Sequence, residues 1–214
     1  MKKLIIIGVG GFGREVAWLV ERINNVVPEW DLIGFIDDNK DFHGTDVNGY
    51  QVLGDSKWLR NQSEDIFAVC AVGSSKVRKK IINKLGNQKY ATLIDPSVQL
   101  SNLVEIGEGS IICAGTIITV NVTLGSHVII NLDCTIGHNA VINSFTTLYP
   151  SVNISGDTIL AECVEMGTGS QIIQGLKIER ATVVGAGSTV VKNLPEYCVA
   201  VGSPAKNIKS LQRE

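Results

Sequence analysis

Several features are scarce in this sequence, and each scarcity excludes a class of protein. The chain has 19 Lys and Arg residues against 21 Asp and Glu, so it lacks the charge excess of a surface that binds nucleic acid or anionic membranes. No apolar stretch is long enough to cross a bilayer, and the N-terminal run stops after four aliphatic residues, too few for a secretory signal. We therefore expect a soluble protein with neither nucleic-acid nor membrane partners.

Cysteine usage points to the compartment. The five cysteines are odd in number and show no CxxC spacing. Such cysteines are typical of reduced, mostly buried thiols, and a cytoplasmic location is expected.

One pattern is abundant and fills the second half of the chain. Every sixth residue there is a large aliphatic, without a break, and chance would give such a run with odds on the order of one in a hundred million. The pattern is therefore a structural repeat. Its 17 positions are Ile94, Leu100, Ile106, Ile112, Ile118, Leu124, Ile130, Ile136, Ile142, Leu148, Ile154, Leu160, Met166, Ile172, Ile178, Val184 and Val190.

The residues between these positions identify the repeat. Two places before each aliphatic the residue is usually small or β-branched, so in a strand both would point inward. The residue after the aliphatic is often Gly, as a corner requires. We predict a left-handed parallel β-helix of hexapeptide units, three units to an 18-residue coil and roughly five coils in all. A long amphipathic helix is excluded, because a period of six does not follow 3.6.

Residues 1–93 follow a different pattern. Short apolar strands are expected at Lys3–Ile7, Leu32–Ile36, Ile66–Val72 and near Ala91–Leu93, with helical spacing at Arg14–Asn24 and Lys76–Leu85. Strands that alternate with helices predict a small, Rossmann-like parallel α/β sheet. We therefore assign residues 1–93 to an α/β domain and residues 94–214 to the β-helix with a C-terminal tail.

A glycine motif opens the first domain. Gly8, Gly10 and Gly13 lie between a strand and a helix, where glycines let a phosphate approach the helix N-terminus. Asp37 follows at the end of the second strand. Because 93 residues provide only half of a dinucleotide fold, a mononucleotide or nucleotide-sugar fits better than NAD. The alternative is that the glycines only allow tight strand–helix packing.

His138 is the most informative residue of the repeat. It comes two places after an inward aliphatic, so it should lie at a corner, and the 18-residue step stacks it between Val120 and Gly156. A histidine beside a glycine amide resembles a general base next to an oxyanion donor, although an exposed corner histidine is equally compatible. A catalytic zinc held by three histidines, as in the γ-class carbonic anhydrases, lacks a third ligand beside His127 and His138, and no metal is expected.

Four motifs give nearly the whole chain a resemblance to a known family. They are IIIGVGGFGREV, GFIDD at 34–38, IGHNAVINSFTTLYPSVNISG at 136–156 and VAVGSPAKNIK at 199–209. With the repeat, they resemble the bacterial sugar O/N-acyltransferases of the sialic-acid O-acetyltransferase type, and especially the N-acetyltransferases of nucleotide-linked 4-amino-sugars. This resemblance implies a homotrimer with acetyl-CoA between adjacent β-helices and the nucleotide-sugar in the N-terminal domain.

The resemblance also implies roles for single residues. His138 looks like the general base, with Asn139 beside it, and Gly156 resembles the residue whose amide faces the thioester oxygen. Three glycines, Gly8, Gly10 and Gly11, are expected to contact the nucleotide phosphates. Asp37 and Asp38 are expected near the nucleobase, and Asn131 is expected to contact the acceptor sugar. The expected coenzyme contacts are Gly156, Thr147, Gly202, Pro204, Ala205 and Lys206, of which Lys206 could pair with a coenzyme phosphate.

The sequence departs from the family pattern at two of these positions. Many relatives carry Glu or Asp after the base, where this chain has Asn139, and an amide stabilises an imidazolium less well than a carboxylate does. Some relatives carry a second histidine where this chain has Thr147. The first departure leaves the activation of the base unexplained, and the second suggests different coenzyme contacts.

Cys134 lies at an inward position of the repeat and is expected in the core, so acyl transfer would be direct. The function expected is N-acetylation of a nucleotide-linked amino-sugar by acetyl-CoA, with sugar O-acetylation and a non-catalytic trimeric scaffold as alternatives.

Overall fold

The structure is a computed structural model that describes residues 1–62 and 65–213. By its contacts the chain divides into two units, Met1–Pro96 (unit 1) and Ser97–Glu214 (unit 2). This division falls three residues after the domain boundary expected from the sequence. Each unit is described separately.

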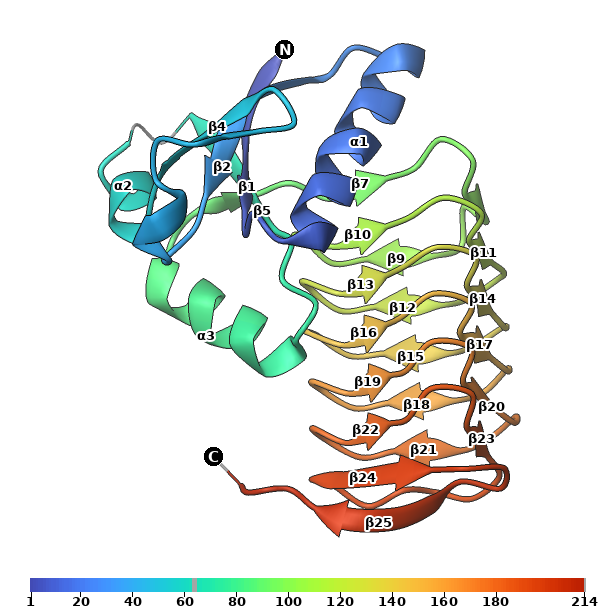
Figure 1. The fold of residues 1–214 in the computed structure, drawn as a ribbon. Helices are drawn as coiled ribbons and strands as arrows, with labels where there is room; N and C mark the ends of the chain where they lie inside the picture. Colours follow the sequence, from blue (N-terminus) through green and yellow to red (C-terminus); the bar gives the residue numbers. More distant parts are fainter. Residues whose placement is uncertain (63–64, 214) are drawn as a thin grey trace. The chain divides into compact units, whose positions relative to one another are not determined.

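Unit 1 is a six-stranded sheet with helices (Figure 1). The strand order is β3-β4-β2-β1-β5-β6, parallel except for the β3–β4 hairpin. The elements are β1 (Lys2–Ile7), α1 (Gly11–Val26), β2 (Trp30–Ile36), η1 (Lys40–Phe42), β3 (Asp46–Val47), β4 (Tyr50–Gly54), α2 (Ser56–Arg60), β5 (Ile66–Cys70), α3 (Ser75–Leu85), β6 (Lys89–Tyr90) and β7 (Leu93–Ile94).

The sequence predicted the alternating strands and helices of unit 1, but not all of its elements. The expected strand near Ala91–Leu93 is two short strands, β6 and β7, that flank this segment. The stretch from η1 to α2 was not predicted. Its strands are short and half-exposed, so they carry little apolar periodicity.

Unit 2 is the parallel β-helix that the hexapeptide repeat predicts, and it is left-handed. Strands of two residues each stack in three faces (Figure 1). The first face contains β10 (Ile111–Ile112), β13 (Ile129–Ile130), β16 (Thr147–Leu148), β19 (Glu165–Met166), β22 (Val183–Val184) and β24 (Cys198–Val201). The second contains β8 (Gln99–Leu100), β11 (Ile117–Ile118), β14 (Thr135–Ile136), β17 (Asn153–Ile154), β20 (Gln171–Ile172) and β23 (Thr189–Val190). The third contains β9 (Glu105–Ile106), β12 (Thr123–Leu124), β15 (Val141–Ile142), β18 (Ile159–Leu160) and β21 (Lys177–Ile178).

From β8 to β23, each rung pairs with the rung 18 residues away, as the predicted coil requires, whereas β24 pairs with β22 at a step of 16 residues. Thr135, for example, pairs with Ile117 on one side and with Asn153 on the other. Every repeat aliphatic from Ile112 to Val190 is buried. Leu100 is 39% exposed because it lies in the first coil, where stacking ends.

The last coil ends in an antiparallel strand. β25 (Lys206–Ser210) runs opposite to β24 and is exposed along its whole length. It lies at the end of the first face and belongs to the tail motif 199–209.

The five cysteines are buried free thiols, as predicted, and Cys134 lies in the β-helix core. Among residues 1–62 and 65–213, no helix combines the length and apolar character needed to cross a bilayer.

Candidate active site

The corner that follows β14 carries His138. The imidazole is about half exposed, and a Cβ placed on Gly156 would lie 2.5 Å from its Cε1 and Nε2 atoms. A side chain at position 156 would therefore displace the ring from this position. The structure places His138 and Gly156 in neighbouring coils, as the 18-residue step predicts.

The Gly156 amide lies in a buried part of this corner. Its N–H donates no hydrogen bond to the residues that the structure describes, whereas the carbonyl of Gly156 accepts one from the Gly175 amide. The arrangement therefore combines an accessible imidazole with an unused backbone N–H. Such a pair can accept a proton from an attacking group and stabilise a developing oxyanion.

Asn139 connects His138 to a carboxylate. Its amide nitrogen is 3.3 Å from Nδ1 of His138 and donates a 2.9 Å hydrogen bond to Oδ1 of Asp157. The other carboxylate oxygen of Asp157, Oδ2, is 4.0 Å from the same ring nitrogen and accepts a 2.8 Å bond from Gln174. The hydrogen bonds from Asn139 and Gln174, together with the nearby imidazole, hold the pKa of Asp157 below its ordinary value. Asp157 is therefore an anion at neutral pH.

The sequence analysis missed Asp157, although the signal for it was present. The 18-residue step was applied to His138 but not to its neighbour, and Asn139 plus 18 is Asp157. In a β-helix, the spatial neighbours of a residue include the residues stacked on it in the adjacent coils as well as the residues next to it in sequence.

Asn131 and three of the expected coenzyme residues, Gly202, Pro204 and Ala205, lie along a different edge of unit 2 from His138. Asn131 follows β13, where the first and second faces meet, and is almost buried, with its side-chain oxygen bound to the Leu132 amide. The turn at 202–205 lies on the same edge, because the Gly202 amide bonds Ser188 Oγ and the Ala205 amide bonds the Thr189 carbonyl. Pro204, preceded by a cis peptide bond, completes this turn.

Thr147 and Lys206 lie on the first face. Thr147 begins β16 and is buried, and Lys206 begins β25 and is exposed. By contrast, His138, Asn139 and Gly156 lie on the edge between the second and third faces. One copy of the chain thus brings the catalytic candidates together, but it does not bring them to the expected coenzyme residues.

A second candidate site lies in unit 1, at the glycine motif. Gly13 is required for packing, since a Cβ there would lie 2.0 Å from the Gly8 carbonyl oxygen, and Gly8 has a φ of +99°. Gly10 and Gly11 instead face open space and begin α1, whose N-terminus has no side-chain cap. The packing alternative therefore explains Gly8 and Gly13 but not Gly10 and Gly11.

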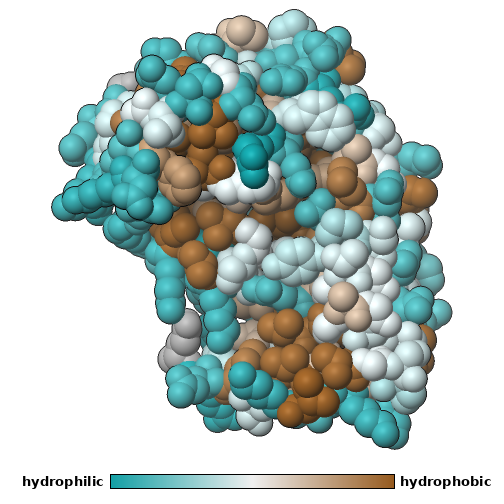
Figure 2. Space-filling view, viewed as in Figure 1, coloured by the Kyte–Doolittle hydropathy of each residue, from teal (hydrophilic) through white to brown (hydrophobic). Residues whose placement is uncertain are grey.

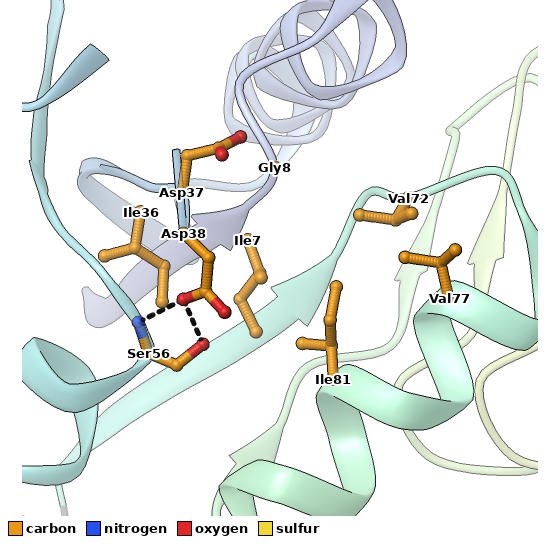
Figure 3. Close-up of a pocket in the computed structure, with 9 residues that line it drawn as sticks. All are labelled: Ile7, Gly8, Ile36, Asp37, Asp38, Ser56, Val72, Val77 and Ile81. Atoms are coloured by element: carbon orange, nitrogen blue, oxygen red, sulfur yellow. Dashed lines mark hydrogen bonds between the residues drawn. The ribbon is translucent and has the colours of Figure 1, made fainter. Parts of the chain in front are cut away.

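Beside this loop is a cavity of about 300 Å³ (Figure 3). It contains three of the predicted residues, Gly8, Asp37 and Asp38, and several that were not predicted. Its lining residues are Ile7, Gly8, Ile36, Asp37, Asp38, Ser56, Val72, Val77 and Ile81. Of the residues that were not predicted, Ser56 comes from α2, which was itself not predicted. The others lie at the ends of β1 and β2, just after β5 and on α3, where apolar residues also fit a simple core.

The two aspartates of the cavity have different roles in the fold. Asp37 accepts hydrogen bonds from the amides of Val9 and Asn39, so it joins the glycine loop to the end of β2. Asp38 points toward Ser56 (Figure 3), which donates to it from its amide and its hydroxyl, and it pairs with Lys84 at 2.7 Å. Burial would raise the pKa of Asp38, but the hydrogen bonds from Lys84 and Ser56 outweigh it and lower the pKa to about 2.

Comparisons with known proteins show which proteins this chain resembles. The family profile described as PglD N-terminal domain matches residues 3–85. The UDP-N-acetylbacillosamine N-acetyltransferase of Bacillus subtilis is 34% identical over 120 residues, which cover 53% of this chain and 52% of that protein. The chain therefore matches about half the length of this curated relative.

Three solved structures match nearly the whole chain. The acetyltransferase domain of PglB from Neisseria gonorrhoeae, in complex with acetyl coenzyme A, is 30% identical, with a TM-score of 0.88 over 97% of this chain and 99% of that one. WeeI from Acinetobacter baumannii is 29% identical, with a TM-score of 0.86 over 96% and 99% of the two chains. A histidine-to-asparagine variant of perosamine N-acetyltransferase from Caulobacter crescentus, with CoA and GDP-perosamine, is 28% identical, with a TM-score of 0.85 over 97% of both chains.

Proposed function

The chain belongs to the hexapeptide-repeat sugar acyltransferases of the PglD type, and from this premise we propose which reaction it catalyses. The proposed reaction moves the acetyl group of acetyl-CoA to the amine of a nucleotide-linked amino-sugar, of the 4-amino-4,6-dideoxy type, for glycan or polysaccharide assembly. The acceptor class is supported by the amino-sugar N-acetyltransferases among the similar proteins.

The observation that carries the proposal is the pairing of His138 with Gly156. The ring is accessible, the neighbouring residue has no side chain, and its amide N–H is not engaged by the described residues. These are the parts that an acyl transfer needs, a proton acceptor and an oxyanion donor within one small space.

In the proposed mechanism the amine attacks directly. When bound, acetyl-CoA supplies an acetyl thioester, whose C–S bond breaks as the new C–N bond forms. His138 accepts the proton that the amine loses and returns it to the departing thiolate sulfur, so the products are an amide and free CoA. The Gly156 amide donates a hydrogen bond to the carbonyl oxygen while that oxygen carries negative charge. Cys134 takes no part, because burial raises the pKa of its thiol to about 11.

The cavity of unit 1 is the proposed site of the nucleotide. Its apolar walls can hold a flat base, and carboxylates can accept hydrogen bonds from base N–H groups. Gly10 and Gly11 leave the N-terminus of α1 open to phosphates.

We also propose that the enzyme is a homotrimer in the cytoplasm. In one copy, His138 is on a different edge of unit 2 from Asn131 and the turn at 202–205. A second copy whose first face packs against this corner would complete the coenzyme site. Figure 2 shows apolar surface over the last coils, where the half-buried side chains of Val183, Val199 and Val201 lie on β22 and β24. The cytoplasmic location is supported by the five reduced cysteines.

The proposal is tested by following thiol release from acetyl-CoA with a panel of acceptors. The panel contains UDP-, dTDP- and GDP-linked 4-amino-sugars, CMP-sialic acid and free sialic acid. We expect turnover on one amino-sugar, and a loss of at least about 100-fold in kcat for His138→Ala, the scale of a lost general base. Lys177→Ala is the matched control, because Lys177 is exposed on β21 and, among residues 1–62 and 65–213, forms its ion pair with the half-buried Glu179.

Other outcomes would select the alternatives. Turnover on sialic acids alone would make the protein an O-acetyltransferase. No turnover together with no binding of acetyl-CoA by calorimetry would favour a scaffold. Full activity in His138→Ala would overturn the assignment of the base.

A further inference from the structure

The histidine of the proposed site has a carboxylate neighbour that comes from another coil. An imidazole that acts as a base benefits from a partner that holds the ring and stabilises the cation it becomes. Here the residue next in sequence is an amide, Asn139, which carries no charge. The anionic group beside the ring is Asp157, one coil further on, with Oδ2 4.0 Å from Nδ1.

Resting on the function proposed above, we propose that Asp157 is the positioning carboxylate of this active site. It holds Asn139 and the imidazole so that Nε2 of His138 faces the substrate, and it stabilises the imidazolium after proton transfer. The role of a carboxylate after the base would thus be filled from the next coil.

The position of Asp157 is itself fixed by two neutral partners. Gln174 donates to Oδ2 at 2.8 Å, and Asn139 donates to Oδ1 at 2.9 Å. Asn121, one coil before, donates to the side-chain oxygen of Asn139 at 3.3 Å, so the amide cannot turn over without losing two hydrogen bonds. The column of residues Asn121, Asn139 and Asp157 therefore acts as one hydrogen-bonded unit beside the ring.

The same contacts decide which ring nitrogen is left for chemistry. Within the described part of the chain, the polar contacts of the imidazole all involve Nδ1, from Asn139 and Asp157. Nε2 is therefore the nitrogen that can receive the substrate proton. A neutral ring must then carry its own proton on Nδ1. The Asn139 amide nitrogen is a donor and cannot accept that proton, whereas the Asp157 carboxylate is an acceptor on the same side of the ring.

The residues stacked above and below His138 offer no other charged group that could stabilise the imidazolium. The coils above and below His138 present Val120, Gly156 and Gln174 in its own column, and none of these is charged. Asp157 is also too exposed, at 44%, to be explained as a buried core group. Its side-chain hydrogen bonds are made to Asn139 and Gln174, so its contacts are confined to this corner.

The test is to remove the carboxylate and then to return it at a neighbouring position. Asp157→Asn should lower kcat about tenfold and Asp157→Ala about 100-fold, while KM for both substrates stays within about threefold, because the group acts on the base rather than on binding. The double variant Asn139→Asp/Asp157→Asn puts the charge next to His138 in sequence and should recover kcat to within about threefold of the starting enzyme. Glu179→Gln, which removes a carboxylate elsewhere in unit 2, should leave kcat unchanged.

The outcomes separate this inference from the proposed function. If the enzyme turns over and His138→Ala is inactive, but Asp157→Asn keeps full kcat, the inference is wrong and the function stands. If the double variant stays as slow as Asp157→Asn while binding acetyl-CoA normally, Asp157 has only a structural role and the inference also fails. If no acceptor is acetylated at all, it is the proposed function that has failed.

Discussion

The two units of this protein differ in how their sequences determine their folds. In unit 2, a six-residue pattern is repeated, and the rungs from β8 to β23 pair with rungs 18 residues away. In unit 1, single side chains such as Arg22 and Asp38 make bonds that occur once. The fold of unit 2 can therefore be predicted from its sequence period. The fold of unit 1 depends on individual contacts that leave no periodic pattern in the sequence.

The comparison can be tested because all three tryptophans, Trp18, Trp30 and Trp58, lie in unit 1. Tryptophan fluorescence therefore reports the unfolding of unit 1 only. Circular dichroism and hydrogen exchange also report on unit 2. The predictions below use this difference, from the largest expected effect to the smallest.

Arg22→Ala should have the largest effect and should act on unit 1. Arg22 makes two hydrogen bonds, of 2.5 and 2.9 Å, to the carboxylate of Asp95, which is only 2% exposed. Removal of the guanidinium takes this charged partner away from a buried carboxylate, and we expect the free energy of unfolding to fall by about 3–4 kcal/mol. Urea denaturation followed by tryptophan fluorescence measures it. The control is Lys2→Ala, whose exposed pair with Glu29 should contribute less than about 1 kcal/mol. Equal losses of unfolding free energy in the two variants would contradict the expectation that the buried ion pair contributes more than the exposed one.

Ile154→Ala should destabilise unit 2 without changing the fluorescence transition. Ile154 is 2% exposed in the middle of the second face, and truncation of such a side chain costs about 2–4 kcal/mol. Hydrogen exchange should speed up most in the coils of its partners, Ile136 and Ile172. Leu100→Ala is the matched control on the same face, where the residue is already 39% exposed and the loss should stay below about 1 kcal/mol. A uniform change over all coils would show that unit 2 unfolds as a single block.

Asp38→Asn should have the smallest effect, and it should depend on pH. The pKa of Asp38 is lowered to about 2 from an ordinary value of 3.8, so its stabilising effect is present above pH about 4 and disappears as the pH falls toward 2. Since its side chain is about half exposed, solvent screening limits the effect to about 1 kcal/mol at neutral pH. Fluorescence-detected urea curves at pH 6 and pH 2.5 should show a difference at pH 6 that falls to about one third at pH 2.5. A constant difference would mean that the ionic pair with Lys84 is not its source.

The residues show where sequence reasoning succeeds. The period fixed the inward positions of unit 2, such as Cys134 and Ile172, because alternation in a strand leaves no freedom in which side chain is buried. The period also predicted that Gly156 lies next to His138, because residues 18 positions apart are stacked on one another in neighbouring coils.

Sequence reasoning failed where contacts are irregular, and where a side chain in one coil contacts a residue of the next coil that is not its direct stacking partner. Ser56 was missed because α2 has only five residues and β4 before it is half-exposed, so neither produces a clear pattern. Asp157 was missed because the family pattern directed attention to the position after the histidine. The carboxylate is one coil away, which a linear motif cannot express.

The antiparallel strand β25 has a consequence for how the molecule ends. A stack of parallel rungs has no internal limit, since each last rung offers free N–H and C=O groups to another chain. On the first face, β25 binds those groups of β24 in the opposite direction and presents the exposed cations Lys206 and Lys209. Charged, reversed edge strands of this kind discourage end-to-end pairing. β25 therefore protects the first face against growth into filaments, a hazard that the regularity of unit 2 would otherwise create.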